Sequence, residues 1–368
     1  MIDNNAFKKM RLTPLFALLV VMMAWALPGC GYSDGDFFWV SRNNAEMPVW
    51  VRGNTDSGVF VILNHGGPGS SGLFEVYMEA APGNGEVDHV SPLRQLEEDY
   101  AVVYWDQRHS GNAQGNADPD ETTWEDFGAD LELVIDTLNS RHDVESVFVI
   151  GQSWGHAVGT IYLTLGDDWQ RRQDKVDGYI IYKGNITANM PYEFAAPRGL
   201  ELAQEQIDSG DDSAMWQDCA VLWRDTESLS VAQDYMEHQM CVDHAMDAVV
   251  STGQRILTSL AFSFRSAHNG WYHSANNSAT LGSTFMDRVV TEEPLLETAH
   301  RIELPTLLLY GALDLTAPSE VGQWHYDTIG TPAADKKLVI LEQSRHGAEG
   351  NDIEVLQQEL SEFIETYL

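Results

Sequence analysis

The chain has 368 residues, of which 43% are hydrophobic, so it is long and apolar enough to bury a substantial core and is not globally disordered. It carries 56 acidic and 21 basic residues, a net charge of −35, which argues against nucleic acid or an anionic membrane surface as a functional partner. The length fits one large domain or a domain with an insertion.

Residues 1–30 are typical of an export signal. A positively charged start is followed by a mostly apolar run, residues 12–27, which is too short for a comfortable transmembrane helix. The run ends in Leu-Pro-Gly-Cys30, which resembles the lipobox of bacterial lipoproteins and predicts a lipid on Cys30. We therefore expect an exported protein, anchored by its N-terminal lipid to a membrane of a bacterial cell envelope. Cleavage after Ala24-Trp-Ala26, which would release a soluble secreted or periplasmic protein, and an uncleaved anchor are the alternatives.

Export changes how the two other cysteines, Cys219 and Cys241, are interpreted. An oxidising compartment lets them pair, and such a disulfide would stabilise the fold by roughly 3 kcal/mol. Two unpaired buried thiols are the alternative. No C-x-x-C or His/Cys cluster suggests a metal site.

Short apolar strands alternate with helices along much of the chain. In chain order we expect a β-hairpin (37–42 with 47–52), then two buried strands (59–63 and 100–105) with a short helix (92–98) between them, and an amphipathic helix (124–139). Four further strands (147–150, 178–182, 306–310 and 337–341) and a C-terminal helix (352–367) follow. This alternation predicts an α/β fold with a mostly parallel sheet that has helices on both faces.

The alternation stops between about residues 185 and 301. This block is interpreted as helices with polar loops, at 194–209, 211–227 and 231–251. We expect it to be a cap inserted over the carboxyl edge of the sheet, where open α/β sheets bind ligands. The predicted organisation is a signal peptide (1–30), the first part of the core (31–184), the cap (185–301) and the second part of the core (302–368).

A G-x-S-x-G pentapeptide, Gly151 to Gly155, lies between the strand at 147–150 and a helix-compatible run. A strand, a sharp turn and a helix around this motif are typical of a nucleophile elbow, in which a strained turn exposes the serine hydroxyl. The pattern therefore predicts that Ser153 is a nucleophile. A glycine-rich turn with an inert serine is the alternative.

A nucleophilic serine needs a base and an acid that orients the base. Asp314 directly follows the strand at 306–310, and His346 follows the next strand, so both are expected at the same sheet edge as Ser153. A helix cap is the alternative role for Asp314.

The developing oxyanion needs two backbone N–H donors. The loop His65-Gly-Gly-Pro-Gly69 follows the strand at 59–63, and its glycines allow close approach of the backbone to a reacting carbonyl. We expect the donors to be the N–H groups of Gly67 and Trp154.

Five segments together resemble an α/β-hydrolase of the proline iminopeptidase (prolyl aminopeptidase) type, namely His65–Gly69, Asp106–Gly111, Gly151–Gly155, Gly311–Asp314 and His346. The resemblance runs from about residue 47 to the C-terminus. It implies the α/β-hydrolase fold, a Ser153–Asp314–His346 triad and no metal or organic cofactor. Asp106 and Arg108 match the D-Q-R segment of the family, for which we expect a supporting role.

The chain also departs from the family. His109 stands where the family usually has glycine, and His156 where it usually has a small residue. We expect His156 to be a substrate-pocket or core residue and not the base. These aminopeptidases bind the substrate amine with cap carboxylates, for which the candidates here are Glu201, Glu205, Asp218 and Glu227; solvated helix faces are the alternative.

The sequence thus predicts an exported serine hydrolase that forms an acyl-enzyme and releases N-terminal residues, proline preferred, from short peptides. A carboxylesterase acting on small esters would use the same machinery. A lipid-anchored binding protein without catalysis is the third possibility. The expected partners are a small-molecule or short-peptide substrate and, through the lipid, a membrane.

Overall fold

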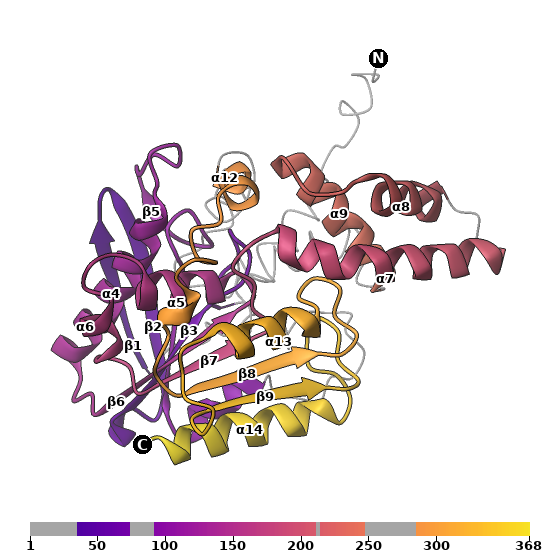
Figure 1. Cartoon of the computed structure of the whole chain (residues 1–368). Helices are drawn as coiled ribbons and strands as arrows, with labels where there is room; N and C mark the ends of the chain where they lie inside the picture. Colours follow the sequence, from indigo (N-terminus) through magenta and orange to yellow (C-terminus); the bar gives the residue numbers. More distant parts are fainter. Residues whose placement is uncertain (1–34, 74–91, 211–213, 247–284) are drawn as a thin grey trace, which may run out of the picture.

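A computed structural model of the chain describes residues 35–73, 92–210, 214–246 and 285–368 (Figure 1). The predicted signal peptide, with Cys30, and part of the predicted cap lie outside the described residues. Within those four ranges, no helix is both long and apolar enough to cross a membrane.

Nine strands of the described chain form one sheet. Eight of them lie in the order β1-β2-β4-β3-β6-β7-β8-β9, and β5 pairs with β2 beside this path. Strand β2 pairs antiparallel with β1, β4 and β5. All pairs along the path β4-β3-β6-β7-β8-β9 are parallel. In chain order the strands are Gly35–Arg42, Ala45–Gly53, Val59–Asn64, Ala101–Trp105, Gln114–Gly115, Ser146–Gln152, Gly178–Tyr182, Thr306–Gly311 and Lys336–Leu341.

The predicted hairpin is formed by β1 and β2. Its two turn residues, Asn43 and Asn44, have φ angles of 48° and 60°. Positive φ at both central positions matches the right-handed twist of the flanking strands, and asparagine tolerates it better than most residues. The sequence pattern therefore places this turn correctly.

Helices cover both faces of the sheet (Figure 1). One apolar cluster joins one face to α4, α5 and α13, and a second joins the opposite face to α3 and α14. The parallel strands β3, β4, β7 and β8 have every residue buried, which explains why they are continuous apolar runs without alternation. The predicted α/β fold is confirmed. The helices that pack with the sheet are α3 (Pro92–Gln95), α4 (Trp124–Arg141), α5 (Gly155–Thr164), α6 (Trp169–Gln173), α12 (Phe285–Thr291), α13 (Ser319–Thr328) and α14 (Asp352–Thr366), with 3-10 turns at Thr55–Ser57, Leu96–Glu98 and Ala299–Arg301. Of these, α12 and the last turn lie within the predicted cap block, yet most of their apolar residues belong to the first of the two core clusters.

Three helices form a separate layer at one end of the sheet: α7 (Asn189–Asp208), α8 (Ala214–Asp225) and α9 (Ala232–Ala245) (Figure 1). They share a third apolar cluster. A disulfide joins Cys219 of α8 to Cys241 of α9, the pairing expected for an oxidising compartment. These helices lie within the block for which the sequence predicts a helical cap.

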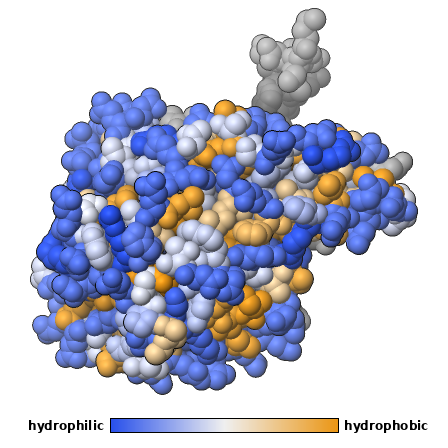
Figure 2. Space-filling view, viewed as in Figure 1, coloured by the Kyte–Doolittle hydropathy of each residue, from blue (hydrophilic) through white to orange (hydrophobic). Residues whose placement is uncertain are grey.

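Hydrophilic residues cover most of the face shown in Figure 2, and hydrophobic residues gather in smaller patches on it.

Candidate active site

Ser153 lies at the turn between β6 and α5 with a φ of 53°, in the left-handed region that side chains rarely adopt. Both flanking glycines are needed for close packing. A Cβ atom at Gly155 would lie 1.9 Å from the carbonyl oxygen of Asn64, and one at Gly151 would lie 2.6 Å from the Cα of His156. The turn therefore has the strained, glycine-dependent geometry of a nucleophile elbow.

The three predicted triad residues form one chain of hydrogen bonds. Nδ1 of His346 lies 2.7 Å from Oδ2 of Asp314, and Nε2 of His346 lies 3.2 Å from Oγ of Ser153. An ionised carboxylate only accepts, so Nδ1 carries the proton and Nε2 is free to accept the serine hydroxyl proton. This arrangement has the geometry that general-base activation of a serine requires.

Asp314 is not a helix cap, which was the alternative for it, because α13 begins at Ser319 with Pro318 at its N-cap position; Asp314 binds the turn before that helix. Its Oδ1 accepts the backbone N–H groups of Thr316 and Ala317 at 2.7 and 3.0 Å, while Oδ2 faces His346. The side chain is fully buried. These backbone donors hold the carboxylate in one orientation, so the turn before α13 positions the acid.

The loop that carries His346 is fixed from several sides. The hydroxyl of Tyr182 accepts the backbone N–H of Ala348 at 3.0 Å, and the ammonium of Lys183 donates to the carbonyl oxygen of His346. The carboxylate of Asp352, at the start of α14, accepts the hydroxyl of Ser344 at 2.7 Å. These contacts hold the loop in place, and with it the imidazole of His346 near Ser153.

Gly67 and Trp154 border the same pocket as Ser153. Gly67 has a φ of 126°, which side chains rarely adopt, and it precedes Pro68 through a cis peptide bond. The structure thus places both predicted oxyanion donors beside the serine.

A buried carboxylate holds the loop that contains Gly67. Asp106 accepts from the Ser71 hydroxyl and the Gly72 N–H through Oδ1, and from the backbone and side chain of Asn112 through Oδ2. Burial raises the pKa of Asp106 and lowers the pKa of its neighbour His65, while the hydrogen bonds to Asp106 favour its charged form. Asp106 therefore ties the oxyanion loop to the end of β4, as expected for a supporting residue.

Gln107 connects the oxyanion loop to the nucleophile helix. Its amide nitrogen donates to the carbonyl oxygen of His65 at 3.0 Å, and its amide oxygen accepts the indole N–H of Trp154 at 3.0 Å. Arg108 forms a buried ion pair with Asp130 of α4, at 2.5 and 2.7 Å. The Asp106–Arg108 segment is therefore structural support, since Asp106 and Gln107 bind the oxyanion loop and Arg108 anchors the segment to α4.

A pocket opens at Ser153 between the sheet edge and the cap helices. None of its described lining residues is a carboxylate; they are Gly67, Pro68, Ser153, Trp154, Asn185, Ile186, Thr187, Ala188, Pro191, Tyr235, His238, Gln239, Met286, Val289 and Thr316. Burial raises the pKa of Tyr235 to about 12. The described wall of the pocket is therefore uncharged near neutral pH.

The substrate-binding assignment of His156 is wrong, and the core alternative is right. His156 is fully buried beneath the elbow, outside the pocket lining. Its Nδ1 lies 2.7 Å from the hydroxyl of Tyr179, and its ring packs edge-on against His325 with centroids 4.5 Å apart. Burial and the neighbouring His325 hold the pKa of His156 well below its usual range.

The cap carboxylates are also misassigned. Glu201, Glu205, Asp218 and Glu227 are all solvent-exposed, and none of them lines the pocket. They occupy the outer faces of α7 and α8 and the loop after α8, because the apolar residues of these helices turn inward. The solvated-face alternative is the correct one.

Several polar lining residues were missed by the sequence analysis. Asn185 follows the end of β7, so the strand-end argument that found Asp314 and His346 applies to it as well. Thr316 lies two residues beyond Asp314. His238 and Gln239 lie within a cap helix, where the sequence gives no sign of which face meets the site.

Comparison with known proteins finds similarity to serine aminopeptidases. Residues 93–260 match a family model described as serine aminopeptidase, S33. A probable aminopeptidase of Bacillus subtilis (strain 168), YbaC, is 22% identical over 315 residues, which cover 83% of this chain and 89% of that protein.

Two solved structures have a similar fold. A putative aryl esterase from Burkholderia cenocepacia has a TM-score of 0.53 at 17% identity, with 90% of this chain and 99% of that chain covered. The proline iminopeptidase of Mycobacterium smegmatis has a TM-score of 0.51 at 14% identity, with 90% and 98% covered. The chain therefore has the α/β-hydrolase fold and is similar in sequence to the S33 serine aminopeptidases.

Proposed function

We propose that the chain hydrolyses its substrate through an acyl-enzyme on Ser153. His346 removes the serine proton as Oγ attacks the substrate carbonyl, and the buried carboxylate of Asp314 orients and stabilises the imidazolium. His346 then protonates the leaving group, and a water molecule activated by the same imidazole releases the acyl group. The observation that carries this proposal is the continuous hydrogen-bond chain from Asp314 through His346 to Ser153.

The N–H groups of Gly67 and Trp154 stabilise the oxyanion of the tetrahedral intermediate in this proposal. Their positions beside Ser153 support this role. Each such donor contributes roughly 3 kcal/mol to transition-state stabilisation.

We propose an aminopeptidase as the leading function, with short peptides, N-terminal proline preferred, as substrates. The family model and the Bacillus relative support this choice. An aminopeptidase also needs a partner for the substrate amine. Among the described residues, Glu293 touches the pocket lining, since its carboxylate accepts the hydroxyl of Thr187 at 2.5 Å.

A carboxylesterase for small esters is the second candidate, and a specific observation favours it. The described pocket lining contains no carboxylate side chain, so nothing in that lining pairs directly with an ammonium group. An ester of an uncharged acid needs no such partner.

The experiment that separates the two compares aminoacyl amides of proline, alanine and leucine with p-nitrophenyl acetate and butyrate, with Ser153→Ala as the control. Turnover of an aminoacyl amide that depends on Ser153, and is lost when the amine is acetylated, supports the aminopeptidase. Turnover of esters alone contradicts it and leaves the esterase. Turnover of neither, with Ser153 unreactive, points to the non-catalytic binding protein.

We also propose that the protein is exported and lipidated on Cys30. The basic start, the apolar run and the lipobox-like end of residues 1–30 support this, as does the Cys219–Cys241 disulfide, since such bonds persist in oxidising compartments. Metabolic labelling with a fatty acid tests it. Label in the wild type but not in Cys30→Ala is expected; equal label in both, or none in either, contradicts lipidation at Cys30.

A further inference from the structure

His238, on cap helix α9, is a pocket residue that neither the triad nor the oxyanion donors use. It is 3% exposed and lines the same pocket as Ser153. Its ring is packed edge-on against Tyr192 of α7, with centroids 4.9 Å apart. An almost fully buried polar ring that borders a substrate pocket requires an account of both its nitrogens.

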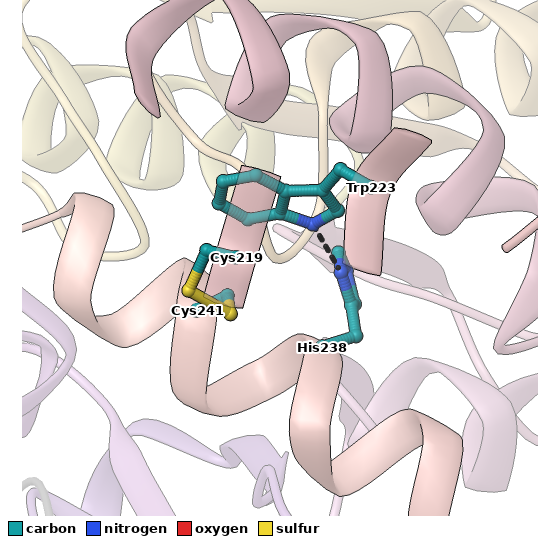
Figure 3. Close-up of a disulfide and its surroundings, with 4 residues drawn as sticks. All are labelled: Cys219, Trp223, His238 and Cys241. Carbon is teal, nitrogen blue, oxygen red and sulfur yellow. Dashed lines mark hydrogen bonds between the residues drawn. A yellow bond between two sulfur atoms is a disulfide. The ribbon is translucent and has the colours of Figure 1, made fainter. Parts of the chain in front are cut away.

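One nitrogen is accounted for within the cap. The indole N–H of Trp223 donates to Nδ1 of His238 at 3.0 Å (Figure 3). Indole nitrogen is a donor only, so Nδ1 must present its lone pair. Burial lowers the pKa of His238 to about 4, so the ring is neutral at pH 7. A neutral imidazole with an acceptor at Nδ1 carries its proton on Nε2.

The other nitrogen is left for a ligand. Nε2 of His238 has no hydrogen-bond partner among the described residues, yet it is not one of the unpartnered nitrogens that are fully enclosed by protein. Because the ring lines the pocket, a ligand held there is the candidate partner for this N–H group.

The surrounding helices fix the direction of this donor. Trp223 lies one helical turn after Cys219, and His238 lies three residues before Cys241, so the disulfide ties together the two helices that carry the indole and the imidazole (Figure 3). The indole also packs against Gly199 of α7, where an added Cβ would come within 2.8 Å of its ring. A donor held in this way selects by position as well as by chemistry.

We propose that His238 is a specificity-determining residue, which donates a hydrogen bond from Nε2 to a carbonyl or ether oxygen of the substrate. The inference rests on the proposed function, because it concerns the substrate of the Ser153 pocket. It deepens that function by naming a substrate class, namely acyl compounds that carry an oxygen acceptor besides the scissile group. An ammonium group would not be a partner for this donor.

The test uses substrate pairs that differ only in an oxygen replacing a methylene. On the acyl side these are p-nitrophenyl methoxyacetate with butyrate, and p-nitrophenyl 3-methoxypropanoate with pentanoate. On the alcohol side the pair is 2-methoxyethyl acetate with butyl acetate. kcat and KM are measured for the wild type, His238→Gln and His238→Leu. The ratio within each pair is compared across variants, which cancels the intrinsic reactivity of each ester.

In at least one pair, we expect His238→Leu to lower the preference for the oxygen-containing member roughly three- to tenfold, the range for one neutral hydrogen bond. His238→Gln retains an N–H donor and should keep most of the preference. Equal losses for both members of every pair, or no change in any pair, would overturn the proposal.

A second measurement is independent of catalysis. Nitrogen-15 NMR of histidine-labelled protein identifies the His238 signals by their loss in His238→Gln. The Nε2–H tautomer is expected in the wild type, and a mixture of tautomers in Trp223→Phe, which leaves the pocket lining intact. The Nδ1–H tautomer in the wild type would overturn the proposal. Failure of the proposed function is recognised separately, as the absence of Ser153-dependent turnover of any ester or amide while the Nε2–H tautomer is present.

Discussion

Asp314 and His346 are 32 positions apart in the sequence, and the structure brings Oδ2 of the one within 2.7 Å of Nδ1 of the other. Parallel pairing of β8 with β9 produces this contact, because the two residues follow the carboxyl ends of neighbouring strands. The same carboxylate accepts two backbone N–H groups through Oδ1, so its position does not depend on the histidine.

The two oxygens of Asp314 can be tested separately. Asp314→Asn keeps an oxygen acceptor for the N–H groups of Thr316 and Ala317. Toward His346 it places an uncharged NH2 donor where the wild type has a charged acceptor. We expect kcat to fall by roughly 10³- to 10⁴-fold with little change in stability. Asp314→Ala should fall as far in kcat and also lose about 2 kcal/mol of unfolding free energy. Steady-state kinetics and urea denaturation check both; equal stability of the two variants would refute the dual role.

The buried ion pair between Arg108 and Asp130 supports the site from α4. Both side chains are almost fully buried, at 2% and 0% exposure. Asp130→Asn leaves a buried guanidinium with reduced compensation, so we expect a loss of about 3 to 5 kcal/mol in unfolding free energy. Arg224→Ala is the control, because Arg224 pairs with Asp225 on the surface, and we expect it to change the unfolding free energy far less than Asp130→Asn does. Similar losses in the two variants would contradict this account.

The disulfide stabilises the cap by restricting the unfolded chain. Cys219 and Cys241 are separated by 22 positions, and a loop of that size corresponds to roughly 3 kcal/mol. The double variant Cys219→Ser/Cys241→Ser should lose about this amount relative to the oxidised protein. Reduction of the wild type should lower its stability to the level of the double variant. Denaturation with and without reductant measures this, and an unchanged midpoint on reduction would show that the bond contributes nothing.

His325 predicts a specific pH dependence of stability. It is fully buried beside His156, neither ring nitrogen has a partner among the described residues, and burial lowers its pKa to about 3. The unfolded state takes up a proton near pH 6.5, whereas the folded state does so only near pH 3, so stability falls as the pH drops through that window. Between pH 6.5 and pH 4 the wild type should lose on the order of 3 kcal/mol of unfolding free energy through His325, and His325→Leu should not show this loss. It should be at least as stable as the wild type at pH 7. An unchanged slope would contradict the assignment.

The parts that the sequence predicted share a physical basis. Continuous apolar runs such as Val147–Ile150 define buried strands, and the residue after such a strand must lie at the sheet edge. That rule located Ser153, Asp314 and His346, and it would have located Asn185 had it been applied to β7. The helix α13 was missed, because Ser319–Thr328 is mostly polar and buries few of its residues.

The pocket wall could not be predicted in the same way. Which face of a cap helix meets the site depends on how the helix docks, and neither periodicity nor composition fixes that docking. Glu201 and Glu205 on α7 point to solvent, whereas His238 on α9 lies in the pocket. His156 was misassigned for a related reason: a polar ring next to the nucleophile suggests function, but the contact with Tyr179 that buries it joins residues distant in sequence.

The central claim is that Ser153 is activated by His346, and the most direct measurement is covalent labelling. The protein is treated with a fluorophosphonate, and the adduct is located by peptide mass spectrometry in the wild type, Ser153→Ala and His346→Ala. We predict one adduct, on Ser153 of the wild type, none in Ser153→Ala, and labelling slowed at least about a hundredfold in His346→Ala. An unlabelled wild type, or labelling of His346→Ala at the wild-type rate, would contradict the account.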